Sequence, residues 1–171
     1  MLPINNSLQD INILSKKDSL IMKLIGVVFP HFYNWVPTTF GNTIYLPANW
    51  NMFKQSVQFI IIEHEKIHAL QQKGSNPYLY HFLNIFVLPI IYCPFRLYSE
   101  TKAWEETIKI ASEYYGADFI YDEGYLWFIS QIDLFYSARG GWMWLNKKAV
   151  LNWLDNIITS NLNKVNSEST T

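Results

Sequence analysis

Five residues near the middle of the chain, His64-Glu65-Lys66-Ile67-His68, have the types and spacing of a metal-binding motif. On a helix, residues four apart lie on the same face, so His64 and His68 can both reach one metal ion. Glu65 stands next to the first histidine, where its carboxylate can reach a metal-bound water rather than the metal. The pattern H-E-x-x-H is therefore typical of metal-assisted hydrolysis, most often with zinc.

The alternative for this motif is a buried helix whose two histidines are satisfied by hydrogen bonds. The segment between Asn51 and Lys73 is strongly apolar and lacks proline and glycine, and it holds two of the chain's four histidines. Burying two imidazoles and a carboxylate on one apolar helix is costly unless a metal or full pairing compensates. We therefore favour the metal site.

A catalytic zinc site usually has three protein ligands and one open position, so a third ligand is required. Glu100 is the best candidate, because Ala103 shares its helix face and is small enough to let that helix approach closely. Arg96, four residues earlier, is placed to orient the Glu100 carboxylate. The alternative without a metal is an exposed Glu100 that forms an ion pair with Arg96. The weaker candidates for the third ligand are His31, His81, Glu105 and Glu106.

The motif His64-Glu65-x-x-His68 followed by Glu100-x-x-Ala103 resembles the gluzincin pattern of zinc metallopeptidases. It is most similar to the compact, single-domain members found among phage and bacterial proteins. The resemblance implies that His64, His68 and Glu100 hold Zn²⁺ with a water in the fourth position. It also implies that Glu65 is the catalytic base and that the substrate is a peptide or protein.

The resemblance covers roughly residues 36–106, including the segment 38–47 and Gln71. Lys102 departs from the pattern, since similar sequences often have an acid there. A recognisable downstream histidine or tyrosine motif that would steady the oxyanion is missing, and spacing alone cannot select a donor among Tyr125, Tyr136 and Arg139. A catalytically inactive zinc-binding protein of the same fold is therefore an alternative function.

The elements that must position these residues are mostly helices. We expect helices over about 18–29, 50–73, 77–89, 95–115, 122–137 and 146–164, with Asp18 or Ser19 as the first N-cap. The segment 38–47 predicts a β-hairpin that turns at Gly41-Asn42 and ends at Pro47. The fold class is thus α+β and mostly helical: a small zincin-like domain with a short N-terminal β-hairpin packed on a helical core. Strand Thr43–Leu46 is either the edge to which an extended substrate adds or an ordinary edge strand.

The domain organisation expected is a loosely ordered segment 1–17, one metallopeptidase domain over 18–165 and a polar tail 166–171. The net charge of −1 gives no electrostatic case for nucleic-acid binding. Cys93 is the single cysteine, which excludes an intrachain disulfide. The sequence predicts neither the oligomeric state nor the cleavage specificity.

The apolar segment 79–95 is the membrane candidate of this sequence. It is at the lower limit of length for spanning a bilayer and contains Pro89 and Pro94. A buried core helix is the favoured interpretation, and membrane association through this segment is the alternative. We expect no signal peptide, and a cytoplasmic or virion-associated location.

Overall fold

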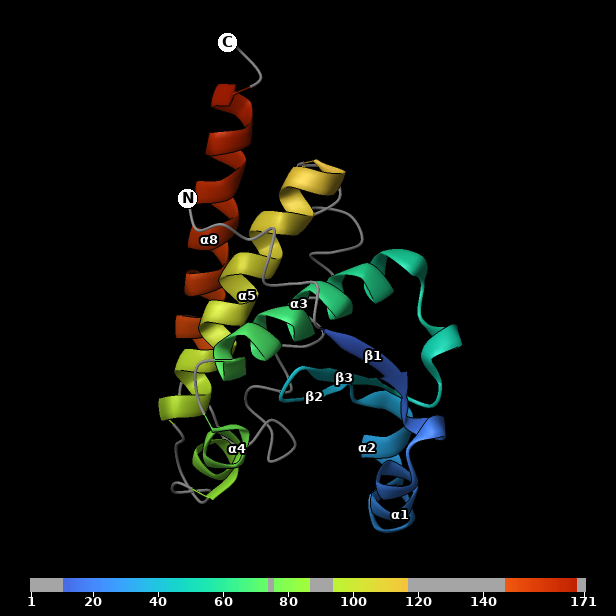
Figure 1. Cartoon of the computed structure of the whole chain (residues 1–171). Coiled ribbons are helices and arrows are strands. Elements are labelled where there is room, and N and C mark those ends of the chain that lie inside the picture. The colour runs from blue at the N-terminus through green and yellow to red at the C-terminus, as the bar shows by residue number, and fades with distance from the viewer. Residues whose placement is uncertain (1–10, 74–75, 87–93, 117–146, 169–171) are drawn as a thin grey trace. The chain divides into compact units, whose positions relative to one another are not determined.

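The structure, a computed structural model, describes residues 11–73, 76–86, 94–116 and 147–168 (Figure 1). The fold is mostly helical with one small three-stranded sheet, which confirms the predicted α+β class. The chain divides into two compact units, residues 1–80 and 81–171. The single domain expected over 18–165 stays a prediction.

The sheet belongs to the first unit and consists of β1 (Asn12–Ser15), β2 (Thr38–Phe40) and β3 (Thr43–Leu46). Its order is β1-β3-β2, with β3 antiparallel to β2 and parallel to β1. The predicted hairpin is therefore confirmed. Gly41 in the turn has φ 60°, a conformation that favours glycine.

The prediction that residues 1–17 are loosely ordered is wrong from Asn12 onward. Strand β1 pairs with β3 in the register Asn12↔Thr43 to Ser15↔Leu46, and the short helix η1 (Lys16–Asp18) follows it. Lys16 is completely buried. The four residues of β1 are too few to show a clear alternation of apolar and polar side chains, so this strand could not be predicted from periodicity.

Two short helices follow the first strand. Helix α1 (Leu20–Val28) begins at Ser19, whose hydroxyl accepts a hydrogen bond from the main-chain N–H of Met22 at 3.3 Å, as a cap residue does. Helix α2 (Pro30–Trp35) was not among the predicted helices, although its first residue, Pro30, suits a helix start. The two helices pack against each other.

The motif lies on α3 (Gln55–Lys73), which starts later than predicted because the short helix η2 (Trp50–Met52) precedes it. Helix α3 packs on strands β2 and β3. Helix α4 (Pro77–Phe86) opens as expected, with the Asn76 side-chain oxygen accepting from the main-chain N–H groups of Tyr78 and Leu79.

The second unit contains α5 (Pro94–Tyr115) and α8 (Lys147–Glu168), which lie side by side (Figure 1). Helix α5 ends before Gly116, at φ 78°, as predicted. Helix α8 runs on into the expected tail, as far as Glu168. The buried Leu154 and Ile158 are one turn apart on α8, which is the spacing of a helix that packs along one face.

Several predictions fall on residues outside the described ranges: the end of the predicted helix 77–89 at Pro89, the single cysteine Cys93 and the helix over 122–137. Of the segment 79–95, the part up to Phe86 belongs to α4, where Tyr80 is buried and Leu79 exposed. None of the helices that the structure describes combines the length and apolar character needed to cross a bilayer.

Candidate metal centre

Helix α3 places the three motif residues on its buried side. His64, Glu65 and His68 are 6%, 7% and 9% exposed. The uninterrupted helix keeps the two histidines one turn apart, on the same face. Three ionisable groups buried on one helix face need specific partners, because an unpaired buried polar group is costly.

The two imidazoles have the geometry of a metal-ligand pair. The Nε2 atoms of His64 and His68 lie 3.1 Å apart, and the two rings are almost perpendicular, at 89°. Two nitrogens that bind one zinc ion tetrahedrally at about 2.0–2.1 Å would lie about 3.3 Å apart. The observed separation is close to that value, so the pair fits a tetrahedral ion.

The His68 ring is oriented by two neighbouring side chains. Its Nδ1 lies 3.0 Å from the amide oxygen of Gln71 and 3.3 Å from the Tyr80 hydroxyl, which itself donates to the Gln71 oxygen at 2.9 Å. Because an amide oxygen only accepts, His68 Nδ1 carries the hydrogen and Nε2 keeps a lone pair for a metal. Gln71 and Tyr80 therefore lie where the outer hydrogen-bond partners of a metal-binding histidine are usually found.

Glu100 joins the two histidines in the structure. Within the described ranges, His64, His68 and Glu100 form a group whose ligand atoms all lie within 4.8 Å of one another and could hold a metal ion. Two imidazole nitrogens and a carboxylate oxygen suit zinc and several other divalent transition metals. The three residues brought together are the three that the sequence favoured.

Three of the four weaker ligand candidates, Glu105, Glu106 and His31, have other surroundings. Glu105 forms an ion pair with Lys102 at 2.6 Å, and Glu106 lies 3.9 Å from Lys109. His31 is exposed on α2. The contact expected between Arg96 and Glu100 stays a prediction.

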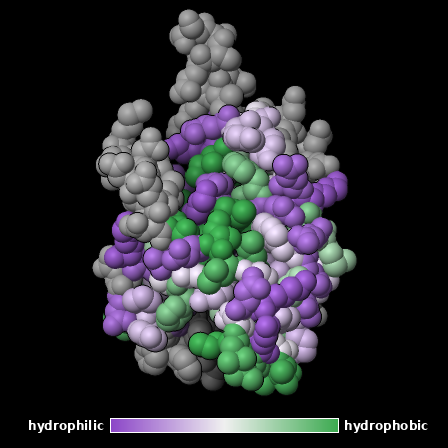
Figure 2. All heavy atoms as spheres, turned by 45° about the vertical axis from the view of Figure 1, so that its right-hand side comes forward, coloured by the Kyte–Doolittle hydropathy of each residue, from purple (hydrophilic) through white to green (hydrophobic). Residues whose placement is uncertain are grey.

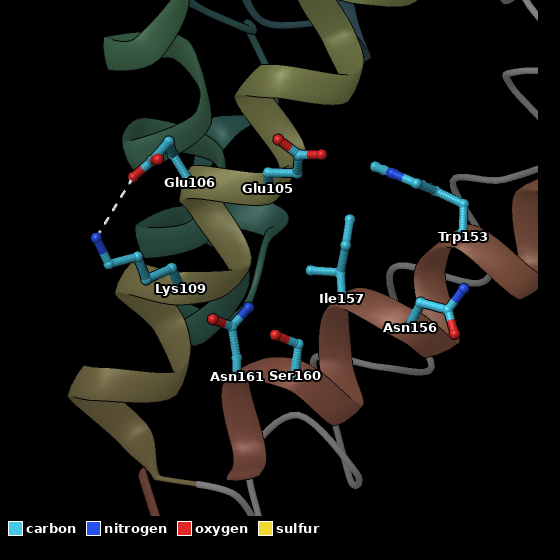
Figure 3. A pocket seen from close by; sticks show the side chains of 8 residues that line it. All are labelled: Glu105, Glu106, Lys109, Trp153, Asn156, Ile157, Ser160 and Asn161. Carbon is cyan, nitrogen blue, oxygen red and sulfur yellow. Dashed lines mark ion pairs between the residues drawn. The ribbon is translucent and has the colours of Figure 1, made fainter. Parts of the chain in front are cut away.

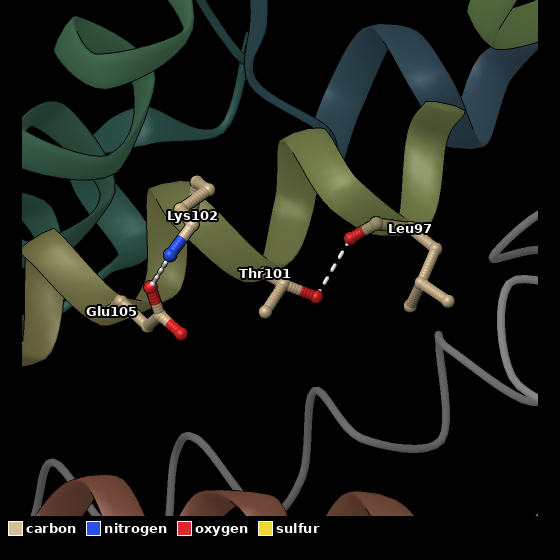
Figure 4. Close-up of polar contacts among 4 residues, drawn as sticks. All are labelled: Leu97, Thr101, Lys102 and Glu105. Carbon is tan, nitrogen blue, oxygen red and sulfur yellow. Dashed lines mark hydrogen bonds and ion pairs between the residues drawn. The ribbon is translucent and has the colours of Figure 1, made fainter. Parts of the chain in front are cut away.

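Lys102, the residue that departs from the gluzincin pattern, is held by a hydrogen bond to Glu105 one turn further along α5 (Figure 4). Its hydrogen bond to Glu105 raises the pKa of Lys102. The pair is largely exposed, so it contributes little to stability. The neighbouring Thr101 bonds back to the Leu97 carbonyl of its own helix at 2.7 Å. The Lys102 charge is thus partly offset by Glu105.

Glu65 is held by a hydroxyl from the sheet. Thr39 on β2 donates to Glu65 Oε2 at 2.6 Å and also lies 3.2 Å from the Glu65 main-chain oxygen. Both residues are buried. The short bond fixes the carboxylate in one orientation. Thr39 was not predicted as a site residue, since no sequence motif connects it to Glu65.

A buried lysine, Lys16, contacts the same strand, β2. Lys16 Nζ donates to the main-chain oxygens of Phe32 and Val36 at 2.9 and 2.6 Å and to the Thr38 hydroxyl at 3.0 Å. It also lies 3.4 Å from the centre of the Phe32 ring. Burial lowers the pKa of Lys16 to about 7, and the charge of Glu65 opposes that shift. Lys16 therefore connects η1 with α2 and β2 and places a titratable group near Glu65.

The prediction that strand β3 lies at the edge of the sheet, where a substrate could add, is wrong, because β3 lies in the middle of the sheet. Strands β1 and β2 pair with its two sides. The outer strand next to α3 is β2, and the Gln72 side chain of α3 covers it. Gln72 donates to the Thr39 carbonyl at 3.3 Å and accepts from the Gly41 N–H at 2.8 Å. Main-chain groups at Thr39 and Gly41 are therefore already bonded, which disfavours addition of an extended peptide there.

Two further points concern Glu63 and the oxyanion donor. From the sequence, Glu63 is either a hydrogen-bond partner of a ligand imidazole or a solvated acid on the helix face. Glu63 pairs with Lys66 at 2.6 Å, which favours its interpretation as an acid on the helix face over a partner of a ligand imidazole. The three possible oxyanion donors, Tyr125, Tyr136 and Arg139, lie outside the described residues.

The second unit contains an open pocket between α5 and α8 (Figure 3). Its cavity of about 410 Å³ is lined by Glu105, Glu106, Lys109, Trp153, Asn156, Ile157, Ser160 and Asn161. It shares no residue with the group formed by His64, His68 and Glu100, so it is not the predicted site.

In comparisons with family models, with curated proteins and with solved structures, this chain has no match. The gluzincin resemblance therefore rests on the motif residues, and the geometry of the site is the observation from which a function can be proposed.

Proposed function

We propose that this protein is a zinc-dependent metallopeptidase that hydrolyses peptide bonds. The observation that carries the proposal is the group formed by His64, His68 and Glu100, whose ligand atoms lie within 4.8 Å of one another. The motif glutamate that follows His64, Glu65, is buried. Two histidines and a glutamate are a ligand set of catalytic zinc sites, which leave one coordination position open.

Each residue of the site has a chemical role in this proposal. His64, His68 and Glu100 hold the metal, and zinc held there supplies a Lewis acid that acidifies water and polarises a carbonyl. Glu65 takes a proton from the attacking water and gives it to the leaving amine. Thr39 keeps the Glu65 carboxylate in place through its 2.6 Å hydrogen bond. Gln71 keeps His68 in the tautomer that can bind a metal.

Metal content tests the binding part of the proposal. We expect about one zinc per chain in the purified native protein and its loss in the His64→Ala variant. His31→Ala is the matched control, since His31 is an exposed histidine outside the motif, and it should retain the zinc. Absence of zinc from the native protein after reconstitution would mean that His64 and His68 are core residues without a metal.

Hydrolysis of a fluorogenic peptide library and of a denatured protein tests the catalytic part. We expect Glu65→Gln to retain zinc and lose turnover by a factor of at least about 100, the usual contribution of a general base. Undiminished hydrolysis in that variant would show that Glu65 is not the base. A native protein that binds zinc without cleaving either substrate would be the inactive zinc-binding alternative.

A further inference from the structure

Helix α1 exposes an unusually apolar surface. Its residues Leu20, Ile21, Leu24, Val27 and Val28 are between 63% and 80% exposed, and the following Phe29 is 61% exposed. Scattered apolar residues are normal on a protein surface, but a contiguous apolar patch marks an interaction site. Figure 2 shows hydrophobic side chains gathered at the lower end of the molecule, where α1 lies in Figure 1.

The exposed residues form one continuous face of the helix. Leu20, Leu24, Val27 and Val28 stand at positions i, i+4, i+7 and i+8, which is the spacing of one helical stripe. The opposite side is apolar as well, with Met22 buried. A helix that is hydrophobic all round belongs in a protein core or in lipid. Within the part of the chain that the structure describes, the outward stripe is exposed.

The outward stripe is held in a fixed position by the packing of α1 on α2. A Cβ atom added at Gly26 would lie 2.6 Å from Cγ of Tyr33, so the absence of a side chain at Gly26 is what permits this close approach. The stripe therefore cannot turn inward by a small rotation of the helix.

Charge identifies the partner that fits this face. Lys23 is the one charged residue of α1, and it lies exposed at the border of the stripe. Lys17 and Asp18 are both exposed just before the helix, so these three side chains carry a net charge of +1. Aliphatic residues with lysines at their border are typical of helices that lie in a membrane surface, where the long lysine side chains reach the headgroups. Interfaces between proteins are instead enriched in tyrosine, tryptophan, phenylalanine, methionine and arginine, none of which is exposed within α1, where Met22 is buried.

We propose that α1 binds the surface of a bilayer that contains anionic lipids. Its nine residues extend about 14 Å, too short to cross a hydrocarbon core of about 30 Å, so the helix lies in the plane of the interface. This site is distinct from the segment 79–95 that the sequence suggested, and it does not depend on the metallopeptidase proposal.

Co-sedimentation of the full chain with lipid vesicles tests the proposal. We expect binding to vesicles of phosphatidylcholine with phosphatidylglycerol and weaker binding to phosphatidylcholine alone. Val27→Glu should lower the partition coefficient at least about tenfold, because a charge would enter the apolar layer. Lys23→Gln should lower it about fivefold on the anionic vesicles. Met52→Glu is the matched control, since Met52 is equally exposed but lies outside α1, and it should bind like the native chain.

Three results would overturn the proposal. The first is a native chain that does not bind the anionic vesicles. The second is a Val27→Glu variant that binds them as well as the native chain does. The third is self-association that Val27→Glu abolishes, without any vesicle binding, which would assign the stripe to a second copy of the chain.

Discussion

Glu65 depends on Thr39, a residue 26 positions earlier in the chain, for its orientation. We predict that Thr39→Val leaves zinc content and KM unchanged and lowers kcat about tenfold to a hundredfold, since a hydrogen bond to a charged group contributes roughly 1.5–3 kcal/mol. Thr39→Ser keeps the hydroxyl and should retain most of the activity. Steady-state kinetics of both variants with equal zinc loading is the measurement. A Thr39→Val variant with native kcat would contradict the positioning role.

Lys16 should make stability depend on pH. Its pKa is lowered to about 7 in the folded chain and is 10.5 ordinarily. Between these values the unfolded chain binds the proton more strongly, so the contribution of Lys16 to the free energy of unfolding increases as pH rises from 7 to about 10, by up to about 1.4 kcal/mol per pH unit. Urea unfolding at pH 7 and pH 10 should show this slope in the native protein and its loss in Lys16→Met.

The exposed Lys17 provides the control for this measurement. Lys17→Met removes a neighbouring lysine that is not buried, so it should leave the slope as in the native protein. An equal slope in native protein and Lys16→Met would mean that the Lys16 ammonium is not destabilised by burial. Glu65 is the charged partner that opposes the shift, so Glu65→Gln should lower the pKa of Lys16 further.

At the residue scale, the sequence predicted the motif ligands but not their supports. His64 and His68 follow from a spacing of four on one helix, which is local information. Thr39 and Lys16 act through contacts across 16 to 26 positions, which exist only once β2 lies against α3 and η1. No local pattern encodes such pairs, so they could not be predicted before the elements were placed.

At the scale of elements, the predicted ends of helices and strands are correct where a capping or turn residue marks them. Ser19 begins α1, Gly41 turns the hairpin and Gly116 follows the end of α5, each for a stated backbone reason. Strand β1 was missed because its pairing with β3 is parallel and long-range. Without that strand, β3 could be mistaken for a sheet edge, which is the origin of the wrong substrate-edge prediction.

The packing of α1 on α2 makes a prediction about Gly26. Glycine to alanine inside a helix normally stabilises by about 1 kcal/mol. Here the new Cβ would meet the Tyr33 ring at 2.6 Å, so we expect Gly26→Ala to destabilise the protein by about 1–3 kcal/mol instead. Urea unfolding is the measurement, and Val27→Ala, at an exposed position of the same helix, should change stability by less than about 0.5 kcal/mol. A stabilised Gly26→Ala variant would show that the two helices can separate at no cost.

At the scale of the whole molecule, the high apolar content of the chain agrees with the apolar side chains exposed on its surface. Half of the 171 residues are hydrophobic and only 16% are charged, which is low for a chain whose whole surface faces water. The outward stripe of α1 is one place where that excess of apolar side chains lies on the surface. This composition indicates either a sparingly charged surface or a surface that is partly covered by lipid or by a partner. It could not assign a covered part to α1, because periodicity shows a stripe without showing which side faces the core.

Metal binding should stabilise the whole chain, because His64, His68 and Glu100 come together only when it is folded. Zinc at about 100 times its Kd adds roughly 2.7 kcal/mol to the free energy of unfolding. For a chain of this length we expect a Tm rise of about 5–10 °C over the metal-free protein in a calorimetric scan. Glu65→Gln should show the full rise, since Glu65 does not bind the metal, whereas Glu100→Gln should lose most of it. An equal rise in Glu100→Gln would remove Glu100 from the ligand set and leave the two histidines as the site.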